Sequence, residues 1–568
     1  MPKKPRPTKQ REPTPRPALP ARRWVLLLAA LVPLFVYWPT TSYLFVLDDF
    51  LLFQKSESLR DLDSIPRGFV ADLGAVRKGT ETVNSSYYRP VFLTLSTLYY
   101  QAVEGDPGDW HAAAVVLAAL IGALACGFFL RLGLPPPVAL LASLVFSLHP
   151  AHVSSVAWVS GVQEVLAALF VLCAVLAILS ARLPTAVAVL FYALALLSKE
   201  VSIGLMAFVA LWALYERSQR LWRTTAVMAG VTVLYLAARV AVLGGLAVPF
   251  PGAPGIGQSL PAVPVAFATY LRLLVAPVEF SFFRPERPVY GPFSAPVLIS
   301  VAVIAVLAGL AWWAIKKRRE LALPLAWLTA FLLPVLNLWA LHPQWMMTDR
   351  YLFLPSLALP WILAILLPRR ALIATLAVLA AVFAGLTLRY SAIFHDERTF
   401  YAAMEKAEPT SAFVHAEKGR LLIQDGNVAG ARAALIRAVE LDPIEPGALE
   451  SLGDLELQRG DLDAAEARFR GALVERPYAS RGFKLVVIAR ARAGQRERAA
   501  ALIEESARRW PEDFEVQLLH ALFLGAAGKW EKAQAAFDAA HRLRPQDPAV
   551  AGGLDNALAR LLPTIQPP

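Results

Sequence analysis

The chain has 568 residues, of which 57% are hydrophobic and 17% are charged, and its mean hydropathy is +0.50. Soluble globular proteins are about half apolar and about a quarter charged, so this composition excludes a disordered chain and a wholly soluble enzyme. It indicates a protein with many membrane spans. The formal net charge of +11 would suggest a nucleic-acid partner for a soluble protein, but here we attribute it to membrane topology and expect no nucleic acid.

The N-terminal part of the chain sets the expected orientation. Residues 1–23 are basic, rich in proline and without apolar periodicity, which predicts a disordered cytoplasmic tail. The apolar run from Trp24 to Leu47 is too long for the core of a signal peptide, and no small-residue cleavage site follows it. We therefore expect an uncleaved first span. Residues 24–390 continue as apolar runs separated by short polar loops, which predicts an all-α transmembrane domain.

Positive charge decides which apolar runs cross the membrane. Thirteen runs can be drawn between residues 24 and 390. If the runs at 88–104 and 261–279 lie at the interface, all basic clusters fall on the cytoplasmic side and about eleven spans remain. This odd number places the C-terminus outside the cytoplasm. The clusters are the N-terminal tail, Arg131, Arg182, Arg217–Arg223, Lys316–Arg319 and Arg369–Arg370.

The hydrophilic C-terminal part contains an internal repeat. We expect a linker helix over residues 391–410, four repeats over 411–550 and a C-terminal tail over 551–568. Small residues at the expected helix crossings and a proline that closes each unit resemble the tetratricopeptide repeat, which predicts stacked helix pairs with a concave face. The glycines and prolines that keep the 34-residue period are Gly426, Gly460, Gly494 and Gly528, and Pro443, Pro477, Pro511 and Pro545.

Charged residues at the outer membrane boundary are candidates for function because their burial is costly. Asp48 and Asp49 follow the first span directly. Mutual repulsion and partial burial raise the pKa of such a carboxyl towards the range of a general base. The alternative is a solvated pair that anchors the loop at the interface.

Two arginines on the same predicted face stand beside tyrosines, Arg89 after Tyr87 and Tyr88, and Arg350 before Tyr351. The planar guanidinium fork suits a phosphate. The alternative is that both side chains extend to lipid headgroups.

Five further polar residues border apolar runs. His149 and His152 have a spacing that suits a metal, but no third ligand is apparent nearby, so we favour hydrogen bonding to substrate or a structural turn. Glu164, Lys199 and Glu200 are candidates for the same site, although Lys199 and Glu200 could simply pair with other polar groups. The chain has no glycine-rich phosphate loop, so nothing indicates a soluble nucleotide.

Four segments occur in an order that resembles a known family. They are SSYYRP (Ser85–Pro90), LHPAHVSSVAWVSG (Leu148–Gly161), LLSKE (Leu196–Glu200) and DRYLFLPS (Asp349–Ser356). With the repeats, they resemble the transmembrane and tetratricopeptide-repeat O-mannosyltransferases over roughly residues 24–550. Where that family usually carries a basic and then an acidic residue after the second segment, this chain has Val162, Gln163 and Glu164.

The resemblance implies a GT-C glycosyltransferase, a multispan enzyme that takes a sugar from a polyprenyl phosphate on the outer face of the membrane. It implies inverting transfer of one sugar, mannose or another hexose, to Ser or Thr of an acceptor protein. The tail and the short first loop suit a bacterial member in the cytoplasmic membrane, with its repeats in the periplasm or outside the cell. We expect no cofactor and no divalent metal.

The resemblance also assigns roles. Asp48 or Asp49 would be the catalytic base, and Arg350, Arg89 and Lys199 would hold the donor phosphate. The rival hypotheses are a non-enzymatic membrane-anchored scaffold for envelope proteins and a ligase or polymerase of lipid-linked oligosaccharides; the acidic pair and boundary motifs favour an enzyme over the scaffold. The residues expected around the sugar and acceptor are Tyr87, Tyr88, His149, His152, Trp158, Glu164, Glu200 and Tyr351.

Overall fold

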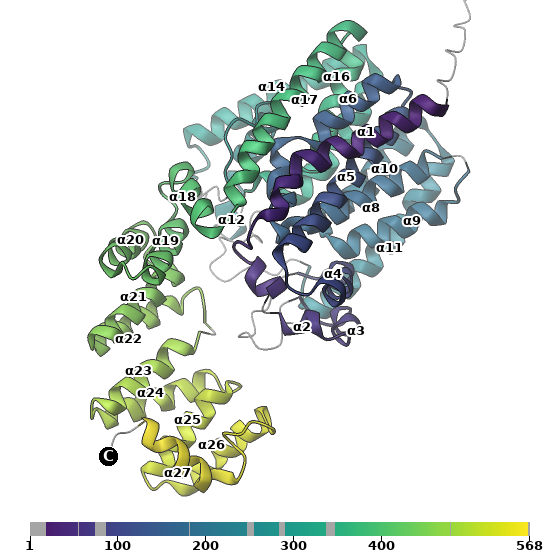
Figure 1. Cartoon of the computed structure of the whole chain (residues 1–568). Coiled ribbons are helices and arrows are strands. Elements are labelled where there is room, and N and C mark those ends of the chain that lie inside the picture. The colour runs from purple at the N-terminus through teal and green to yellow at the C-terminus, as the bar shows by residue number, and fades with distance from the viewer. Residues whose placement is uncertain are drawn as a thin grey trace, which may run out of the picture.

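The computed structural model describes residues 19–54, 56–73, 87–180, 182–246, 255–282, 290–336, 347–477 and 479–565. All regular elements in these ranges are helical, which confirms the predicted all-α class. Long helices form a bundle, and pairs of shorter helices form an array that curves away from one end of it (Figure 1). Residues 1–18 of the predicted tail lie outside the described ranges, and helix α1 begins at Leu19.

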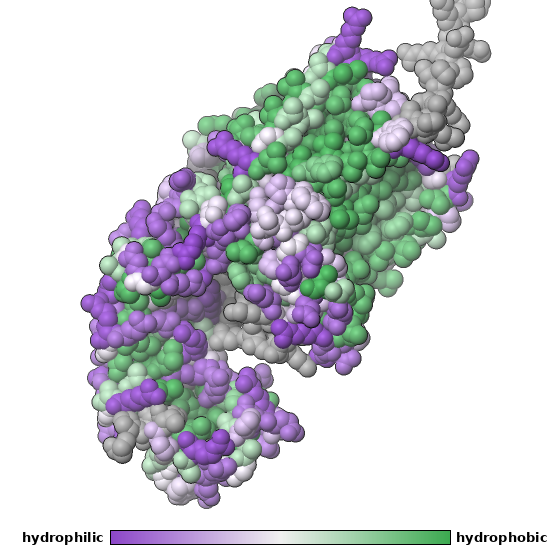
Figure 2. Space-filling view, in the orientation of Figure 1, coloured by the Kyte–Doolittle hydropathy of each residue, from purple (hydrophilic) through white to green (hydrophobic). Residues whose placement is uncertain are grey.

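The bundle consists of helices whose side chains are apolar on nearly every face, as expected for a lipid-facing protein. Its visible surface is hydrophobic, whereas the array is mostly hydrophilic (Figure 2). The main helices are α1 (Leu19–Tyr37), α5 (Pro107–Arg131), α6 (Pro136–Ser147), α8 (Val162–Ile178), α9 (Thr185–Ser198), α10 (Ile203–Glu216), α11 (Gln219–Leu243), α14 (Ala295–Lys317), α15 (Ala322–Leu332), α16 (Ala358–Leu366) and α17 (Arg369–Ser391).

Short helical segments connect the long ones. The α-helical segments are α2 (Glu57–Arg60), α3 (Ser64–Gly68), α4 (Pro90–Val103), α7 (Val153–Val156), α12 (Ile256–Ser259), α13 (Ala262–Val275) and α18 (Glu397–Ala407). The 3₁₀ turns are η1 (Trp38–Ser42), η3 (Pro150–His152), η4 (Val159–Gly161), η5 (Glu200–Ser202), η6 (Arg319–Leu321), η7 (Leu333–Leu336), η10 (Asp349–Leu352), η11 (Pro355–Leu357) and η12 (Ala392–Phe394), and η2 (Phe50–Gln54) is a π-helix.

The predicted count of eleven spans is not supported. Within the described ranges, seven helices are long and apolar enough to cross a membrane, or eight if the bent pair Pro136–Ser147 and Pro150–Val156 is one span. The physical reason is that several apolar runs stop early, where polar motifs turn the chain into 3₁₀ segments. Helices α9, α10 and α16 are therefore only 14, 14 and 9 residues long. The two runs that we placed at the interface form the 14-residue helices α4 and α13.

Basic residues gather at one end of the bundle. Arg131 and Arg220 donate hydrogen bonds to carbonyl oxygens at the end of α8. The Nη1 atom of Arg131 lies 3.3 Å from the Leu179 carbonyl oxygen. Arg318 and Arg319 donate to the carbonyl oxygens of Ile365 and Tyr215. These contacts join the C-terminal ends of α5, α8, α10, α14 and α16. The array leaves from the opposite end, where the Leu44 amide donates to the His395 carbonyl oxygen at 2.9 Å.

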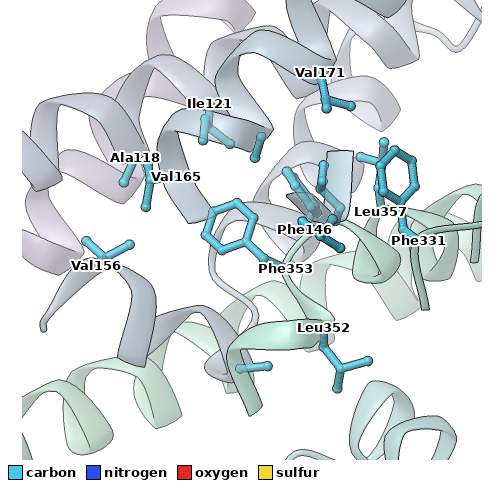
Figure 3. Close-up of a cluster of buried hydrophobic side chains, with 14 of the residues drawn as sticks. Ala118, Ile121, Phe146, Val156, Val165, Val171, Phe331, Leu352, Phe353 and Leu357 are labelled. Carbon is cyan, nitrogen blue, oxygen red and sulfur yellow. The ribbon is translucent and has the colours of Figure 1, made fainter. Parts of the chain in front are cut away.

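Close packing holds the bundle together beneath this opposite end. Gly122 lets α5 lie directly against α1, because any Cβ at this position would collide with the Ala29 carbonyl. Phe146 of α6 and Phe353 pack edge to face, with their ring centres 6.1 Å apart, in a cluster that includes Phe331 and Leu357 (Figure 3). The turns η10 and η11 rest on this cluster, so its packing fixes their position.

Helix α14 differs from its neighbours because it is exposed along almost its whole length. Val297 and Ser300 are its buried residues. Near its C-terminus, the ammonium groups of Lys316 and Lys317 lie 3.6 and 3.9 Å from the ring centres of Trp312 and Trp313. Aromatic and basic residues of this kind mark the membrane–water interface.

The predicted repeats form four helix pairs. Gly426, Gly460, Gly494 and Gly528 all have φ between 71° and 80°, a left-handed conformation that glycine adopts without strain, and each lies in the turn between the two helices of its pair. Part of the segment that we expected as a tail forms α27. The pairs are α19 (Ala412–Gln424) with α20 (Val428–Leu441), α21 (Pro446–Arg459) with α22 (Leu462–Ala472), α23 (Arg481–Arg492) with α24 (Arg496–Arg509) and α25 (Phe514–Ala526) with α26 (Trp530–Leu543), followed by α27 (Gly553–Ile565).

The two ends of the bundle allow a test of orientation. Because basic residues favour the cytoplasmic side, we expect an alkaline phosphatase fused to the C-terminus to be active in a bacterial host. The same reporter inserted after Gly133, at the basic end, should be inactive. An active reporter after Gly133 together with an inactive one at the C-terminus would show the opposite orientation.

Candidate functional site

The predicted site residues lie where apolar helices break at the end of the bundle that carries the array. Pro150 begins η3 and has no amide hydrogen to continue a helix, and Lys199 ends α9 in an extended conformation with φ of −160°. Thr348, also extended, precedes η10. Each break turns polar side chains towards another break rather than towards lipid, as irregular backbone in a membrane requires. Ser85 and Ser86 of the first motif lie outside the described residues.

The acidic pair follows a reversal of the chain at Leu47, a non-glycine residue with φ of 56°. Asp49 is fully buried, whereas Asp48 is half-buried. One carboxylate oxygen of Asp49 accepts hydrogen bonds from the backbone amide of Ser160, at 2.7 Å, and from its hydroxyl. The other accepts from the Val46 amide at 3.3 Å. Asp49 therefore fastens the first outer segment to turn η4.

Burial raises the pKa of Asp49 from 3.8 to about 7, against the opposing effect of the Ser160 hydrogen bonds. The negative charge of Asp48 acts in the same direction as burial. Below pH 7 the Asp49 carboxyl is therefore mostly protonated, and above it mostly ionised.

Arg89 is buried, and all three nitrogens of its guanidinium donate hydrogen bonds. Its Nε and Nη2 donate to the two carboxylate oxygens of Glu200 at 3.1 and 2.6 Å, and its Nη1 donates to the amide oxygen of Gln163. The guanidinium carbon also lies 4.1 Å from the ring centre of Tyr87. Although burial opposes ionisation, Arg89 holds the pKa of Glu200 below its ordinary value. Gln163 in turn donates to the Ser160 carbonyl oxygen at 3.0 Å, which connects this pair to the Asp49 anchor.

Lys199 and Glu164 form a second, almost completely buried ion pair. The Lys199 ammonium also lies 5.6 Å from the ring centre of Tyr351. Burial, together with the like charges of Arg89 and Arg350, outweighs Glu164 and lowers the pKa of Lys199 to about 8. The pair is therefore neutral overall and contributes little net charge to the site.

Arg350 is held differently, by aromatic rings. Its guanidinium carbon lies 5.1 Å from the ring centre of Trp158, 5.5 Å from that of Phe282 and 5.6 Å from that of Tyr351. Within the described ranges, its Nη1 and the Trp158 Nε1 are buried and have no hydrogen-bond partner. A buried donor without a partner is costly, so both nitrogens are poised for an acceptor beyond those that the described residues supply.

Turn η4 and the residues beside it bring these groups together. Asp49 accepts from Ser160, two residues after Trp158, whose ring centre lies 5.1 Å from the Arg350 guanidinium carbon. Gln163 donates to the Ser160 carbonyl oxygen and accepts from Arg89. Burial also raises the pKa of Tyr87, the ring that lies beside Arg89.

Three other predicted pocket residues bond to the protein itself. His149 Nε2 lies 3.1 Å from the Leu274 carbonyl oxygen, and its Nδ1 accepts from the Ala151 amide. His152 Nε2 lies 2.9 Å from the Ser356 hydroxyl, and its ring stacks on Phe353 at 3.9 Å. Tyr88 donates to the Phe69 carbonyl oxygen at 3.1 Å. Their roles towards a sugar remain predictions.

Sequence reasoning did not select Ser160, Gln163 or Phe282 for the site. Ser160 lies in the second motif, two residues after the predicted site residue Trp158, and this position could have marked it as a candidate. Gln163 stands where a basic residue was expected and instead accepts a hydrogen bond from Arg89. No sequence pattern indicated Phe282.

The chain is similar to known proteins in two comparisons. A family model described as tetratricopeptide repeat matches residues 417–480 and 487–548. The chain is also similar to protein O-mannosyl-transferases. It is 24% identical to human protein O-mannosyl-transferase TMTC3 over 277 residues, which are 46% of this chain and 28% of that protein. It is 27% identical to human TMTC4 over 162 residues, covering 26% of this chain and 22% of that protein.

A mouse TMTC3 match has 26% identity over 190 residues, which are 32% of this chain and 20% of that protein. The chain thus spans about a quarter of the length of these curated relatives. Among solved structures, a chain of the APC/C hetero-tetramer Cut9–Hcn1 aligns with a TM-score of 0.25 and 15% identity over 83% of this chain and 92% of that one.

The Asp49 anchor leads to a prediction about titration. Ser160→Ala removes a hydroxyl that stabilises the carboxylate, so the pKa of Asp49 should rise above about 7. Infrared difference spectra that follow the carboxyl band lost in Asp49→Asn would measure it. Ser155→Ala, which changes another buried serine of the same segment, should leave the band unmoved. A wild-type midpoint near 3.8 would contradict the burial argument.

Proposed function

We propose that the chain is a membrane glycosyltransferase of the GT-C type. It moves one sugar, mannose or another hexose, from a polyprenyl phosphate to a Ser or Thr hydroxyl of an acceptor protein, with inversion at the anomeric carbon. One observation carries the proposal: a single turn region joins the acidic pair to a buried arginine, because Asp49 bonds to Ser160 and the nearby Trp158 ring contacts Arg350, whose Nη1 has no partner among the described residues. The similarity to proteins named O-mannosyl-transferases supports the choice of sugar and acceptor.

In this proposal Asp48 is the base and Asp49 positions it. A base must contact the acceptor hydroxyl, and Asp48 is half-buried while Asp49 is fully buried with its oxygens bonded to Ser160 and Val46. Asp48 accepts the proton of the hydroxyl as its oxygen attacks the anomeric carbon, and the bond from that carbon to the phosphate oxygen breaks. The sugar thus passes to the acceptor and a polyprenyl phosphate leaves.

The leaving phosphate gains charge, and a preorganised cation is often the largest contribution to such catalysis. Arg350 is the cation of choice because its Nη1 is buried without a partner in the described part of the chain. Arg89 and Lys199 are already paired with Glu200 and Glu164 and add positive potential rather than direct contacts. Because fixed cations can balance the phosphate, we propose no divalent metal and no other cofactor.

Tyr87, Trp158 and Tyr351 are proposed to border the sugar, since their rings surround the charged groups. For the whole protein we propose the cytoplasmic membrane of a bacterium, with the basic end of the bundle inside. The site and the array then share the outer face. A scaffold would not need a buried arginine nitrogen that has no partner among the described residues, and this observation favours transfer over that alternative.

Separate substitutions of the two aspartates test the base. Asp48→Asn keeps the shape but cannot take the proton, so transfer should fall by about 10²–10⁴-fold. Its melting temperature in detergent should stay at the wild-type value. In Asp49→Asn, one side-chain atom that faces the Ser160 or Val46 donors becomes an amide NH₂, so both melting temperature and activity should fall. Full activity in Asp48→Asn with an intact fold would remove the assignment.

The array is proposed to present the acceptor. A groove of about 810 Å³ runs across α19, α21 and α23, the first helices of three pairs. Apolar side chains such as Leu485 and Ile488 line it next to arginines, which suits an extended peptide. Held beside the site, a bound acceptor has a raised local concentration.

Removal of residues 411–568 should therefore raise the apparent KM for a protein acceptor and spare hydrolysis of the donor lipid. Arg481→Glu, in the groove, should raise the same KM. Arg508→Glu, an equal charge change on an exposed arginine outside the groove, should not. An unchanged rate with the truncated enzyme would make the repeats a docking platform for other envelope proteins.

A further inference from the structure

A buried aromatic cluster joins the candidate site to the first helix beyond the bundle. Phe400 of α18 lies 5.4 Å from Phe282 and 5.3 Å from Phe394, and Phe282 and Phe394 are 5.8 Å apart between ring centres. At most 3% of any of these side chains is exposed. The cluster is therefore packed protein interior and not a lipid-facing surface.

Phe282 connects this cluster to the candidate site. One side faces the site, where its ring lies 5.5 Å from the Arg350 guanidinium carbon and meets Trp158 edge to face at 5.1 Å. The other side rests on Phe394 and Phe400. A displacement of Phe400 therefore reaches Arg350 through a single intervening ring.

The segment that carries Phe282 is fixed by α17 and α18. Tyr390 donates to the Val278 carbonyl oxygen at 2.7 Å, and Ser281 donates to the Glu408 carboxylate just after α18. Phe280 packs on Tyr390 at 5.4 Å. The position of Phe282 thus depends on the same two helices that lead into the array.

The turn that leads into α18 also reaches the acidic side of the site. His395, two residues before the helix, has its ring centre 5.2 Å from that of Tyr43, and its carbonyl oxygen accepts from the Leu44 amide. The segment formed by His395 and α18 therefore contacts the segments that carry both proposed halves of the reaction, the base and the phosphate cation.

We propose that α18 is part of the catalytic unit and that Phe400 is a positioning residue, which acts through Phe282 to hold Arg350 where the donor phosphate binds. This inference rests on the proposed function. Arg350 needs such support because rings, rather than hydrogen bonds at its Nη1, surround its guanidinium. Loss of the Phe400 ring lets Phe282 relax away from Arg350, and the phosphate then meets a less ordered cation.

The test measures binding of undecaprenyl phosphate, the sugar-free product lipid, to the full-length protein in detergent. Phe400→Ala should raise its Kd by about tenfold, the order of loss expected when a desolvated cation–aromatic contact is released. Phe400→Leu, which keeps most of the apolar volume, should show a smaller rise. Phe483→Ala removes an equally buried ring from the third repeat and should leave the Kd unchanged.

A double-mutant cycle separates positioning from general destabilisation. Arg350→Lys alone should weaken binding, because the planar fork is lost. Adding Phe400→Ala to it should change the Kd less than twofold, since residues that act through one contact are not additive. The inference is overturned if Phe400→Ala raises the Kd as much in the Arg350→Lys protein as in the wild type. It is also overturned if Phe400→Ala alone leaves the Kd at the wild-type value. If the wild type does not bind the lipid, the proposed function itself fails.

Discussion

A charge or a backbone amide at the edge of a membrane needs a partner from the protein, and the candidate site depends on this requirement throughout. The breaks at η4 and η5 expose polar groups that only other polar groups can satisfy. Asp49 takes both donors of Ser160, Gln163 connects Ser160 to Arg89, and Arg89 takes both oxygens of Glu200. These links make four separated segments one unit. Loss of one member leaves another buried and uncompensated, so the unit behaves cooperatively.

Among the described residues, two cations of the site are paired with carboxylates, and the third has a buried nitrogen without a hydrogen-bond partner. Arg89 and Lys199 each have a carboxylate within bonding distance, whereas Arg350 is surrounded by aromatic rings. An aromatic face stabilises a cation but leaves its hydrogen-bond donors unused. Within the part of the chain that the structure describes, an anion entering the site therefore finds one cation with an unused donor and two cations that are already paired. An anion is therefore expected to bind at Arg350 in particular, whereas a uniformly positive cavity would not favour one position.

The sequence predicted well what depends on local periodicity. The 34-residue spacing of Gly426 and its equivalents predicted the repeats, because each glycine occupies a left-handed turn. Two motifs also supply Arg89 and Glu200, which pair in the structure, while the roles of the site residues stay predictions. Sequence could not give the span count, since hydropathy does not show that an apolar run stops early at a motif such as SKE. Nor could it show how Arg89 is paired, because its partners Gln163 and Glu200 lie more than 70 residues away along the chain.

Helix α14 has a consequence for how the protein responds to its membrane. With Val297 and Ser300 as its buried residues, it has little protein packing to fix its angle. The Trp312–Lys316 and Trp313–Lys317 contacts hold one end at the headgroup level. A helix anchored at one end and otherwise surrounded by lipid accommodates a change in hydrocarbon thickness by tilting. We therefore expect α14 to lean further in a thin bilayer-mimicking micelle than in a thick membrane, while the packed helices around the site keep their angles.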